Sequence, residues 1–359
     1  MRRVTPGGPL AIGYRLAPRS SATAENATVD GLMRAVTYER VGTRPSLQRV
    51  PIPACPPDGA LVRVEATGVC RSDWHAWRGH DPVPLPHTPG HEFAGTVAQI
   101  GSLIRDVAVG TRVTAPFVNG CGVCAWCLGG DAQVCPEQSQ PGFSHPGSFA
   151  DYVVVRAADF NLVPLPDAVD AVTAAALGCR FATAFRALTG HATVGPGTQV
   201  AVFGCGGVGL SVAMIAVALG ARVTAVDLSA PALDRARELG AATTIRSADP
   251  VAQVVAATDG GAQVSVDALG SSGTADAAVR SLRRRGTHVQ VGLMLGAAAA
   301  APLPWDRLIA WELTVVGSHG MAAADYPPML ELVTSGRLRP GRLVGSVVGL
   351  AGAIDAMVA

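Results

Sequence analysis

Apolar residues in the first half of the chain occur in short runs separated by turn residues. This pattern predicts strands rather than long helices. The strands expected from it are residues 35–38, 60–67, 93–100, 111–117 and 152–156. Prolines are frequent in the loops between them, and their fixed φ angles stiffen those loops. The first half therefore predicts an irregular β domain with rigid connections.

The pattern changes at Thr198. A buried strand is expected at residues 199–203, a glycine turn at 204–209 and a helix at 210–219. A second strand and helix follow at 222–226 and 230–239, and further strands are expected at 264–268, 288–291 and 313–316. Strands that alternate with helices are typical of a parallel, doubly wound sheet.

The most apolar stretch of the chain, residues 199–223, has the length of a membrane span. Four glycines interrupt it after a strand-length run, so a strand, turn and helix are the better interpretation. The tail is expected to form helices at 326–335 and 350–359.

These patterns predict an α/β protein of two domains. Residues 33–180 and 321–359 are expected to form the irregular β domain, and residues 181–320 the doubly wound domain. Residues 1–32 show no apolar period, and we expect little order there. Their arginines and serines resemble an organellar transit peptide, but Glu25 and Asp30 favour a plain extension.

Composition narrows the classes of function. With 49% hydrophobic and 15% charged residues the chain is globular, and a formal net charge of +1 gives no basic surplus for nucleic acid or an anionic membrane. A small-molecule ligand is expected instead. The eight cysteines lie in a long chain without a secretory signal, which favours metal binding over disulfides and a cytoplasmic location.

Four of the cysteines are clustered within one glycine-rich loop. Four thiolates at this spacing can surround one Zn²⁺ tetrahedrally, which leaves no position for substrate and indicates a structural site. The alternatives are chance clustering, disulfides, or a nucleic-acid-binding zinc ribbon, which usually has two separated cysteine pairs. The four residues are Cys121, Cys124, Cys127 and Cys135.

A glycine-rich turn follows the strand at 199–203. Its glycines are Gly204, Gly206, Gly207 and Gly209, and Asp227 ends the next expected strand. In this context the glycines let the backbone approach a pyrophosphate, and Asp227 can accept hydrogen bonds from the adenosine ribose. That carboxylate would repel a 2′-phosphate, and neither Leu228 nor Ser229 carries a positive charge that could offset the repulsion. NAD is therefore expected over NADP.

Together these features resemble the zinc-dependent alcohol dehydrogenases of the medium-chain dehydrogenase/reductase superfamily. The resemblance runs from about Met33 to the end of the chain. The motifs that carry it are Gly68-Val-Cys-Arg-Ser-Asp-Trp-His75, Gly90-His-Glu92, the four-cysteine loop, Gly178-Cys179 with Thr183, and Gly204-Cys-Gly-Gly-Val-Gly209. It implies a GroES-like catalytic domain and a Rossmann domain with the active site in the cleft.

The resemblance also implies the metal ligands. Cys70, His91 and Cys179 would bind a catalytic zinc and leave one coordination position open. Taken alone, each of the three is more often a packed core cysteine or a surface histidine than a metal ligand. Asp73 would orient His91, and Glu92 would lie behind the metal. With the four-cysteine loop this makes two zinc ions per chain.

The remaining roles follow from the same resemblance. Ser72 would pass the alcohol proton by way of the nicotinamide ribose to His75, and Phe117 would line the substrate pocket with Trp74 and Trp77 near it. Without the family, His75 is an ordinary surface histidine and Asp73 a helix-start cap. The residues expected to contact the cofactor are Arg71, Thr183, Val208 and Val291, besides the glycines and Asp227.

Two classes of function remain open from the sequence. The first is an NAD-dependent oxidoreductase that interconverts an alcohol and its aldehyde or ketone; the second is a silent scaffold that keeps the fold and one zinc. Within the first, a polyol or amino-alcohol dehydrogenase is the alternative, although Cys179 in place of a glutamate ligand favours simple alcohols. We expect a homodimer or homotetramer. Family members usually add a closing strand after the last helix, and this sequence reaches its last residue, Ala359, before such a strand is expected.

Overall fold

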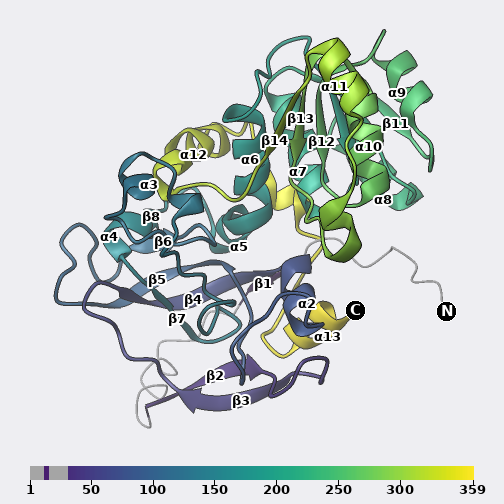
Figure 1. Ribbon diagram of the computed structural model, residues 1–359. Coiled ribbons are helices and arrows are strands. Elements are labelled where there is room, and N and C mark those ends of the chain that lie inside the picture. Colours follow the sequence, from purple (N-terminus) through teal and green to yellow (C-terminus); the bar gives the residue numbers. More distant parts are fainter. Residues whose placement is uncertain (1–11, 16–30) are drawn as a thin grey trace. The chain divides into compact units, whose positions relative to one another are not determined.

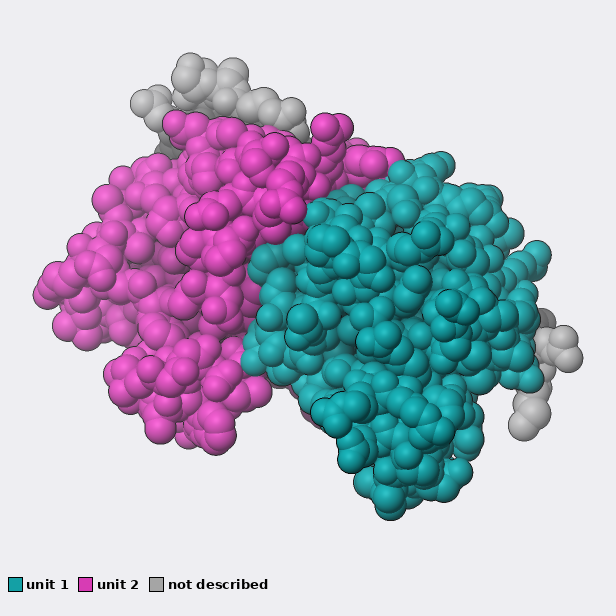
Figure 2. All heavy atoms as spheres, turned by 90° about the horizontal axis from the view of Figure 1, so that it is seen from above, with its two compact units in different colours: residues 1–8, 183–319 teal, residues 9–182, 320–359 magenta. Residues whose placement is uncertain are grey.

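The computed structural model describes residues 12–15 and 31–359, which divide into two compact units. Residues 183–319 form one of them, which we call the parallel-sheet unit. The rest of the described chain, up to Ala182 and from Gly320 onward, forms the irregular β unit. Figure 2 colours the two units separately. The predicted Rossmann range of 181–320 is close to the parallel-sheet unit.

A six-stranded parallel sheet forms the centre of the parallel-sheet unit (Figure 1). Its strand order is β11-β10-β9-β12-β13-β14, and every neighbouring pair is parallel. The strands are β9 (Gln199–Phe203), β10 (Arg222–Val226), β11 (Thr243–Ile245), β12 (Ala262–Asp267), β13 (Leu282–Gln290) and β14 (Thr314–Gly317). The prediction of a doubly wound α/β fold is confirmed.

Helices connect these strands because each parallel pair needs a crossover. The connecting segments are α7 (Gly207–Ala218), α8 (Ala230–Glu238), α9 (Val251–Ala257), α10 (Ser272–Arg280), η4 (Gly296–Ala300) and α11 (Trp305–Trp311), and α6 (Ala182–Thr189) precedes the first strand. Helix α7 packs against β9 and β10, and most of its residues are buried, which explains its nearly continuous apolar sequence. The sequence of strand β9 is also nearly continuously apolar, because Val200, Ala201 and Val202 are fully buried.

A seven-stranded sheet organises the irregular β unit, with β7 pairing beside the main path β15-β1-β4-β5-β6-β8. Its strands are β1 (Ile12–Arg15), β4 (Ala60–Val69), β5 (Glu92–Ile100), β6 (Arg112–Thr114), β7 (Tyr152–Val155), β8 (Val163–Pro164) and β15 (Ser346–Val348). A separate hairpin-like pair consists of β2 (Leu32–Thr37) and β3 (Ser46–Pro51). The core beneath β4 and β5 is built from Val62, Val64, Phe93 and Val97.

The helical segments of this unit are short, and several lie in its loops. They are α2 (Arg71–Trp77), α3 (Ala125–Leu128), η2 (Ala132–Val134), α4 (Ala158–Asn161), α5 (Ala171–Ala175), the π-helical turn η3 (Leu177–Phe181), η5 (Ala323–Asp325), α12 (Tyr326–Thr334), η6 (Pro340–Leu343) and α13 (Gly352–Val358). The sequence pattern predicted α12 and α13 but not α2, whose seven residues are too few for a helical period to show.

Within residues 1–32, for which little order is expected, the structure describes one short strand before residue 31. Ile12–Arg15 form β1, which pairs antiparallel with β4 and parallel with β15. Four residues give no readable alternation, so this strand depends on its two neighbours rather than on a local pattern. The other residues of 1–30 lie outside the described part of the chain.

Across the residues that the structure describes, no helix combines the length and the apolar character needed to cross a membrane.

Candidate active site and metal centres

Strand pairing brings two of the predicted catalytic ligands together. Cys70 follows β4 directly and His91 precedes β5, and the register of these two strands pairs Gly68 with Glu92. Cys179 reaches the same place from the π-helical turn η3, a conformation that often occurs at functional sites. One ligand atom each from Cys70, His91, Glu92 and Cys179 lies within 4.8 Å of all the others.

Asp73 holds this arrangement from beneath. One carboxylate oxygen accepts hydrogen bonds from the Gly90 amide at 3.0 Å and from Nδ1 of His91 at 3.1 Å, while the other accepts from the Cys70 amide at 2.9 Å. Asp73 is completely buried. The side chain therefore orients the imidazole and also caps the first turn of α2, so both interpretations of Asp73 describe the same residue.

The hydrogen bond at Nδ1 leaves Nε2 of His91 without a partner. This nitrogen is buried, and no hydrogen bond reaches it. An unsatisfied buried imidazole nitrogen is costly unless something else binds it. Two thiols and one free imidazole nitrogen form a donor set that suits Zn²⁺ and leaves a fourth position open. The residues present therefore fit a catalytic zinc.

The charges in the cluster are strongly coupled. The interaction between the neighbouring Cys70 and Cys179 thiols lowers the pKa of Cys70 well below its usual value and raises the pKa of Cys179. Burial acts to lower the pKa of His91, but the Asp73 carboxylate outweighs it and raises that pKa. Deprotonated sulfur at Cys70 is the form that binds a metal.

Glu92 lies in the same cluster but is held by a partner that the sequence patterns did not reveal. Its carboxylate accepts three hydrogen bonds from Arg180, from the amide at 3.2 Å, from Nε at 2.8 Å and from Nη2. Burial raises the pKa of Glu92, and the Arg180 guanidinium opposes that shift. Arg180 lies in an otherwise apolar stretch of sequence, and a buried cation needs an anionic partner. This isolated positive charge is the sequence feature that could have indicated a buried ion pair.

Helix α2 carries the predicted relay residues. Ser72 Oγ lies 3.7 Å from the Cys70 sulfur. His75 is half-buried, and its Nδ1 lies 3.0 Å from Nδ1 of His80, a residue for which the sequence motifs predict no role. Arg71 stacks on Trp74, with its guanidinium carbon 3.7 Å from the ring centroid. The expected contact of Arg71 with the cofactor stays a prediction.

Two aromatic rings flank His91. The Phe117 ring centroid lies 6.1 Å from that of His91, and Phe143 lies 5.0 Å from it. Phe143 was not predicted, because a single phenylalanine in a glycine- and proline-rich loop shows no pattern. Trp77 belongs to a buried core cluster, and its indole nitrogen donates to the Thr43 carbonyl at 2.6 Å. It is therefore a packing residue.

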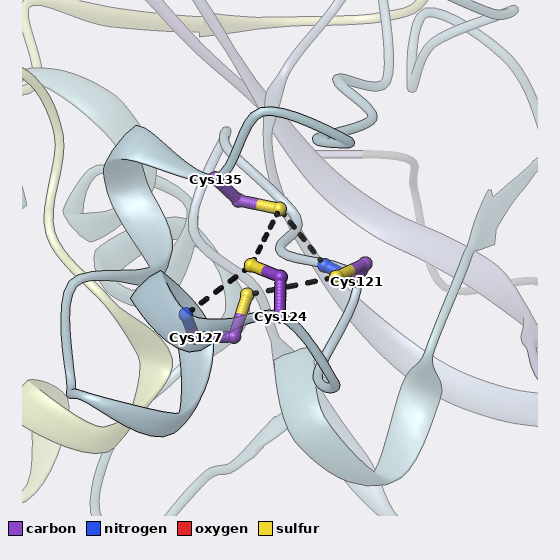
Figure 3. Close-up of side chains that lie close together, drawn as sticks. All are labelled: Cys121, Cys124, Cys127 and Cys135. Atoms are coloured by element: carbon purple, nitrogen blue, oxygen red, sulfur yellow. Dashed lines mark hydrogen bonds between the residues drawn. The ribbon is translucent and has the colours of Figure 1, made fainter.

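The four-cysteine loop forms a second cluster (Figure 3). Its four sulfur atoms lie within 4.8 Å of one another. Cys124 caps α3 and accepts a hydrogen bond from the Cys127 amide at 3.5 Å, and the Cys135 sulfur accepts one from the Cys121 amide at 3.4 Å. Backbone amides at Val123 and Cys124 lower the pKa of Cys121 to about 7.

The sulfur separations distinguish a metal site from disulfides. Cys124 and Cys135 are 3.7 Å apart and Cys121 and Cys127 are 4.0 Å apart, and all eight cysteines of the chain are free. A disulfide needs about 2.05 Å. Four sulfurs at about 2.3 Å from a tetrahedral zinc lie about 3.8 Å from one another. The loop therefore fits a structural zinc.

Three glycines of the turn after β9, Gly204, Gly206 and Gly209, have different structural roles. Gly204 has φ +90°, which allows the sharp turn, and a Cβ at Gly209 would lie 1.8 Å from the Gly204 carbonyl oxygen. A Cβ at Gly206 would meet nothing within 4 Å. This open space at the N-terminus of α7, where Gly207 and Val208 begin the helix, suits the close approach of a pyrophosphate.

Asp227 directly follows β10, and backbone amides hold both of its carboxylate oxygens. One accepts from the Cys205 amide and the other from the Ser229 amide, each at 2.7 Å. Val291 directly follows β13, so it lies at the same carboxyl edge of the sheet where nucleotides bind. Thr183 lies in α6 and is buried. Their contacts with a cofactor stay predictions.

Comparison with known proteins agrees with this picture. The family described as "Alcohol dehydrogenase GroES-like domain" matches residues 56–167, and the family described as "Zinc-binding dehydrogenase" matches residues 207–335. An alcohol dehydrogenase of Geobacillus stearothermophilus is 33% identical over 313 residues, which cover 86% of this chain and 90% of the relative. A sorbitol dehydrogenase of Halalkalibacterium halodurans is 33% identical over 323 residues, 87% of this chain and 91% of that protein.

Among solved structures, alcohol dehydrogenase TADH from Thermus sp. ATN1 superimposes with a TM-score of 0.84 at 31% identity, covering 90% of this chain and 95% of that one. Sequence, fold and metal-binding clusters thus agree. The chain belongs to the zinc-dependent alcohol dehydrogenases of the medium-chain dehydrogenase/reductase superfamily and is an oxidoreductase of alcohols or polyols with zinc and NAD as its cofactors.

Proposed function

We propose that this enzyme oxidises simple alcohols to aldehydes or ketones at a centre formed by Cys70, His91 and Cys179. In the reverse direction it reduces the aldehydes or ketones to alcohols. One observation carries the proposal: two thiols and a buried imidazole nitrogen without a partner converge at one point. Three protein donors with an open position are the arrangement of a catalytic zinc rather than a structural one.

A zinc ion bound there would supply a Lewis acid that eases loss of the alcohol proton, and NAD would accept the hydride. Asp73 fixes the tautomer of His91 by accepting from Nδ1. Arg180 keeps the Glu92 carboxylate paired, which leaves the two thiols and the imidazole as the donors. Ser72 lies next to the Cys70 sulfur and would accept the hydrogen bond of the substrate hydroxyl.

The aromatic rings support a preference within the alcohol class. Phe117 and Phe143 present apolar surface beside His91, and such surface favours substrates without further hydroxyl groups. The related sorbitol dehydrogenase keeps a polyol as the second candidate. A polyol would need buried polar partners for its additional hydroxyls.

A substrate panel tests the proposal. Purified enzyme with NAD is mixed with ethanol, benzyl alcohol, 2-propanol, sorbitol and an amino alcohol, and NADH absorbance is followed. We expect the highest kcat/KM with a simple or aromatic alcohol. Highest kcat/KM with sorbitol would favour the polyol candidate, and no turnover of any compound by protein that contains zinc would contradict the proposed function.

The environment of His75 predicts the pH dependence of alcohol oxidation. Burial lowers the pKa of His75 below its ordinary value of 6.5, and His80 and Arg71 lower it further, whereas the charges of Cys70 and Asp81 oppose the shift. The relay needs neutral His75 to receive a proton. Activity should therefore persist below pH 6.5, and the acidic limb of the kcat profile should lie below that value.

Replacing His80 by asparagine removes one of the charges that lower the pKa of His75. We expect the acidic limb of the kcat profile to move to higher pH, and His75→Gln to abolish that limb with a lower kcat. An acidic limb that stays in place in both variants would show that His75 does not take part in the relay.

We further propose that the enzyme forms a homodimer through the β14 edge of the parallel sheet. Among the described residues, β14 pairs with β13 alone, and Trp305 and Ile309 on the preceding helix α11 are 63% and 76% exposed. An open edge beside exposed apolar side chains is typical of a subunit interface. Light scattering should show a dimer for the wild type and a smaller species for Ile309→Asp.

We also propose that the enzyme works in the cytoplasm. The support is chemical: all eight cysteines carry free thiols, and both clusters need reduced sulfur to bind zinc.

A further inference from the structure

Three neighbouring strands of the parallel sheet present different chemistry at their carboxyl ends. The sheet order places β11 beside β10 and β10 beside β9. The glycine turn follows β9, Asp227 follows β10 and Arg246 follows β11. A nucleotide bound on the glycine turn extends its adenosine ribose over β10, toward Asp227. Arg246 therefore stands on the side of Asp227 that faces away from the glycine turn.

Backbone pairing fixes this placement. Val226 pairs with Ile245, and the Asp227 amide donates to the Ile245 carbonyl at 3.2 Å, so the residues after these strands are neighbours. Nε of Arg246 donates to the Leu228 carbonyl at 2.9 Å. This bond ties the guanidinium to the residue that directly follows Asp227.

The charge of Arg246 is available to a ligand. The side chain is exposed, and within the described residues no carboxylate forms an ion pair with it and no acceptor binds its two terminal nitrogens. Arg237 and Arg280, by contrast, are paired with carboxylates on their own helices. A guanidinium with free terminal nitrogens is the group that binds phosphate by two parallel hydrogen bonds.

Asp227 cannot turn aside to make room, because the Cys205 and Ser229 amides hold both of its oxygens. The carboxylate therefore stays in place as an acceptor for the ribose hydroxyls and repels a 2′-phosphate. Arg246 supplies the opposite charge next to it. Leu228 and Ser229 carry no such cation, and Arg246 brings one from the end of the following strand.

We propose that Arg246 is a cofactor-recognition residue that binds the 2′-phosphate of NADP, so that the enzyme accepts NADP as well as NAD. The inference rests on the proposed binding of the nucleotide at the glycine turn. It changes the expected cofactor range from NAD alone to both nucleotides, with the balance set by the opposed charges of Asp227 and Arg246.

The test measures binding and needs no turnover. Isothermal titration calorimetry compares 2′,5′-ADP with 5′-AMP on the wild-type enzyme, on Arg246→Ala and on the control Arg222→Ala, which removes an exposed arginine from the opposite end of β10. A charged hydrogen bond to phosphate predicts that Arg246→Ala weakens 2′,5′-ADP binding about tenfold or more. Binding of 5′-AMP, and both ligands on Arg222→Ala, should change little. Arg246→Lys should retain part of the affinity.

Three outcomes overturn the assignment: no binding of 2′,5′-ADP to the wild type while 5′-AMP binds, equal binding of 2′,5′-ADP to Arg246→Ala and the wild type, or an equal loss of both ligands in Arg246→Ala. The last would place the guanidinium on the adenine or the loop. Failure of both ligands to bind the wild type would instead contradict the nucleotide site of the proposed function, and with it this inference. An unchanged thermal melting curve of Arg246→Ala shows that the variant is folded.

Discussion

Replacement of Cys70 by serine is expected to lower kcat/KM for the best alcohol by about a thousandfold or more. A hydroxyl binds zinc far less well than a thiolate, and loss of a Lewis acid that lowers the barrier by about 4 kcal/mol corresponds to that factor. Elemental analysis should show that the zinc content falls from about two ions per chain to about one. The fold and nucleotide binding should remain, because Cys70 lies outside the parallel-sheet unit.

Cys55→Ser is the matched control. Cys55 is a free, partly buried thiol of the same unit that belongs to neither cluster. It should keep both zinc ions and full turnover. Turnover by Cys70→Ser near the wild-type rate, or a zinc content unchanged by the substitution, would contradict the catalytic assignment.

Replacement of Cys127 by serine is expected to have the largest effect on stability. Cys127 is buried in the four-cysteine loop, and a structural zinc contributes directly to the folding of the segment that binds it. We expect the free energy of unfolding to fall by at least about 3 kcal/mol, with a decrease of roughly 10 °C in the midpoint of thermal unfolding. One zinc per chain should be lost while the catalytic zinc remains.

The control for this variant is Val123→Ser, in the same loop. Val123 is 79% exposed, and its apolar side chain offers no ligand atom for a metal. Its replacement should therefore leave the melting temperature and the zinc content unchanged. Equal melting temperatures for Cys127→Ser and Val123→Ser would mean that the loop holds no stabilising metal.

The features that could be predicted from the sequence are those encoded over short distances. The four cysteines lie within fifteen residues, and the glycine turn lies between a buried strand and a helix, so spacing alone brings their groups together. The parallel sheet was predictable for a similar reason, because fully buried strands such as Gln199–Phe203 are almost continuously apolar.

The catalytic trio could be proposed only through the family resemblance. Cys70 and His91 meet because β4 and β5 pair in a particular register, and Cys179 joins them from a π-helical turn. None of these three conditions can be derived from the spacing of the residues. The resemblance supplied the trio, and the geometry then showed a buried His91 nitrogen that has no hydrogen-bond partner and lies beside the two sulfurs.

The residues missed in the sequence depend on pairing across the fold. The role of Arg180 depends on its pairing with Glu92, that of His80 on its contact with His75, and that of Arg246 on its position near Asp227. Strand β1 likewise exists because β4 and β15 offer hydrogen bonds on both of its sides. A long-range partner is needed in every case, and a pattern read along the chain does not contain it.

The central claim is that Cys70, His91 and Cys179 bind one zinc ion with an open coordination position. Anomalous diffraction measured on both sides of the zinc absorption edge from crystals of the enzyme tests it directly. We expect two peaks per chain, one within the four-cysteine loop and one bonded to both sulfurs of Cys70 and Cys179 and to Nε2 of His91. A peak in the cysteine loop with none at the trio, or a metal there without a bond to Cys179, would contradict the account.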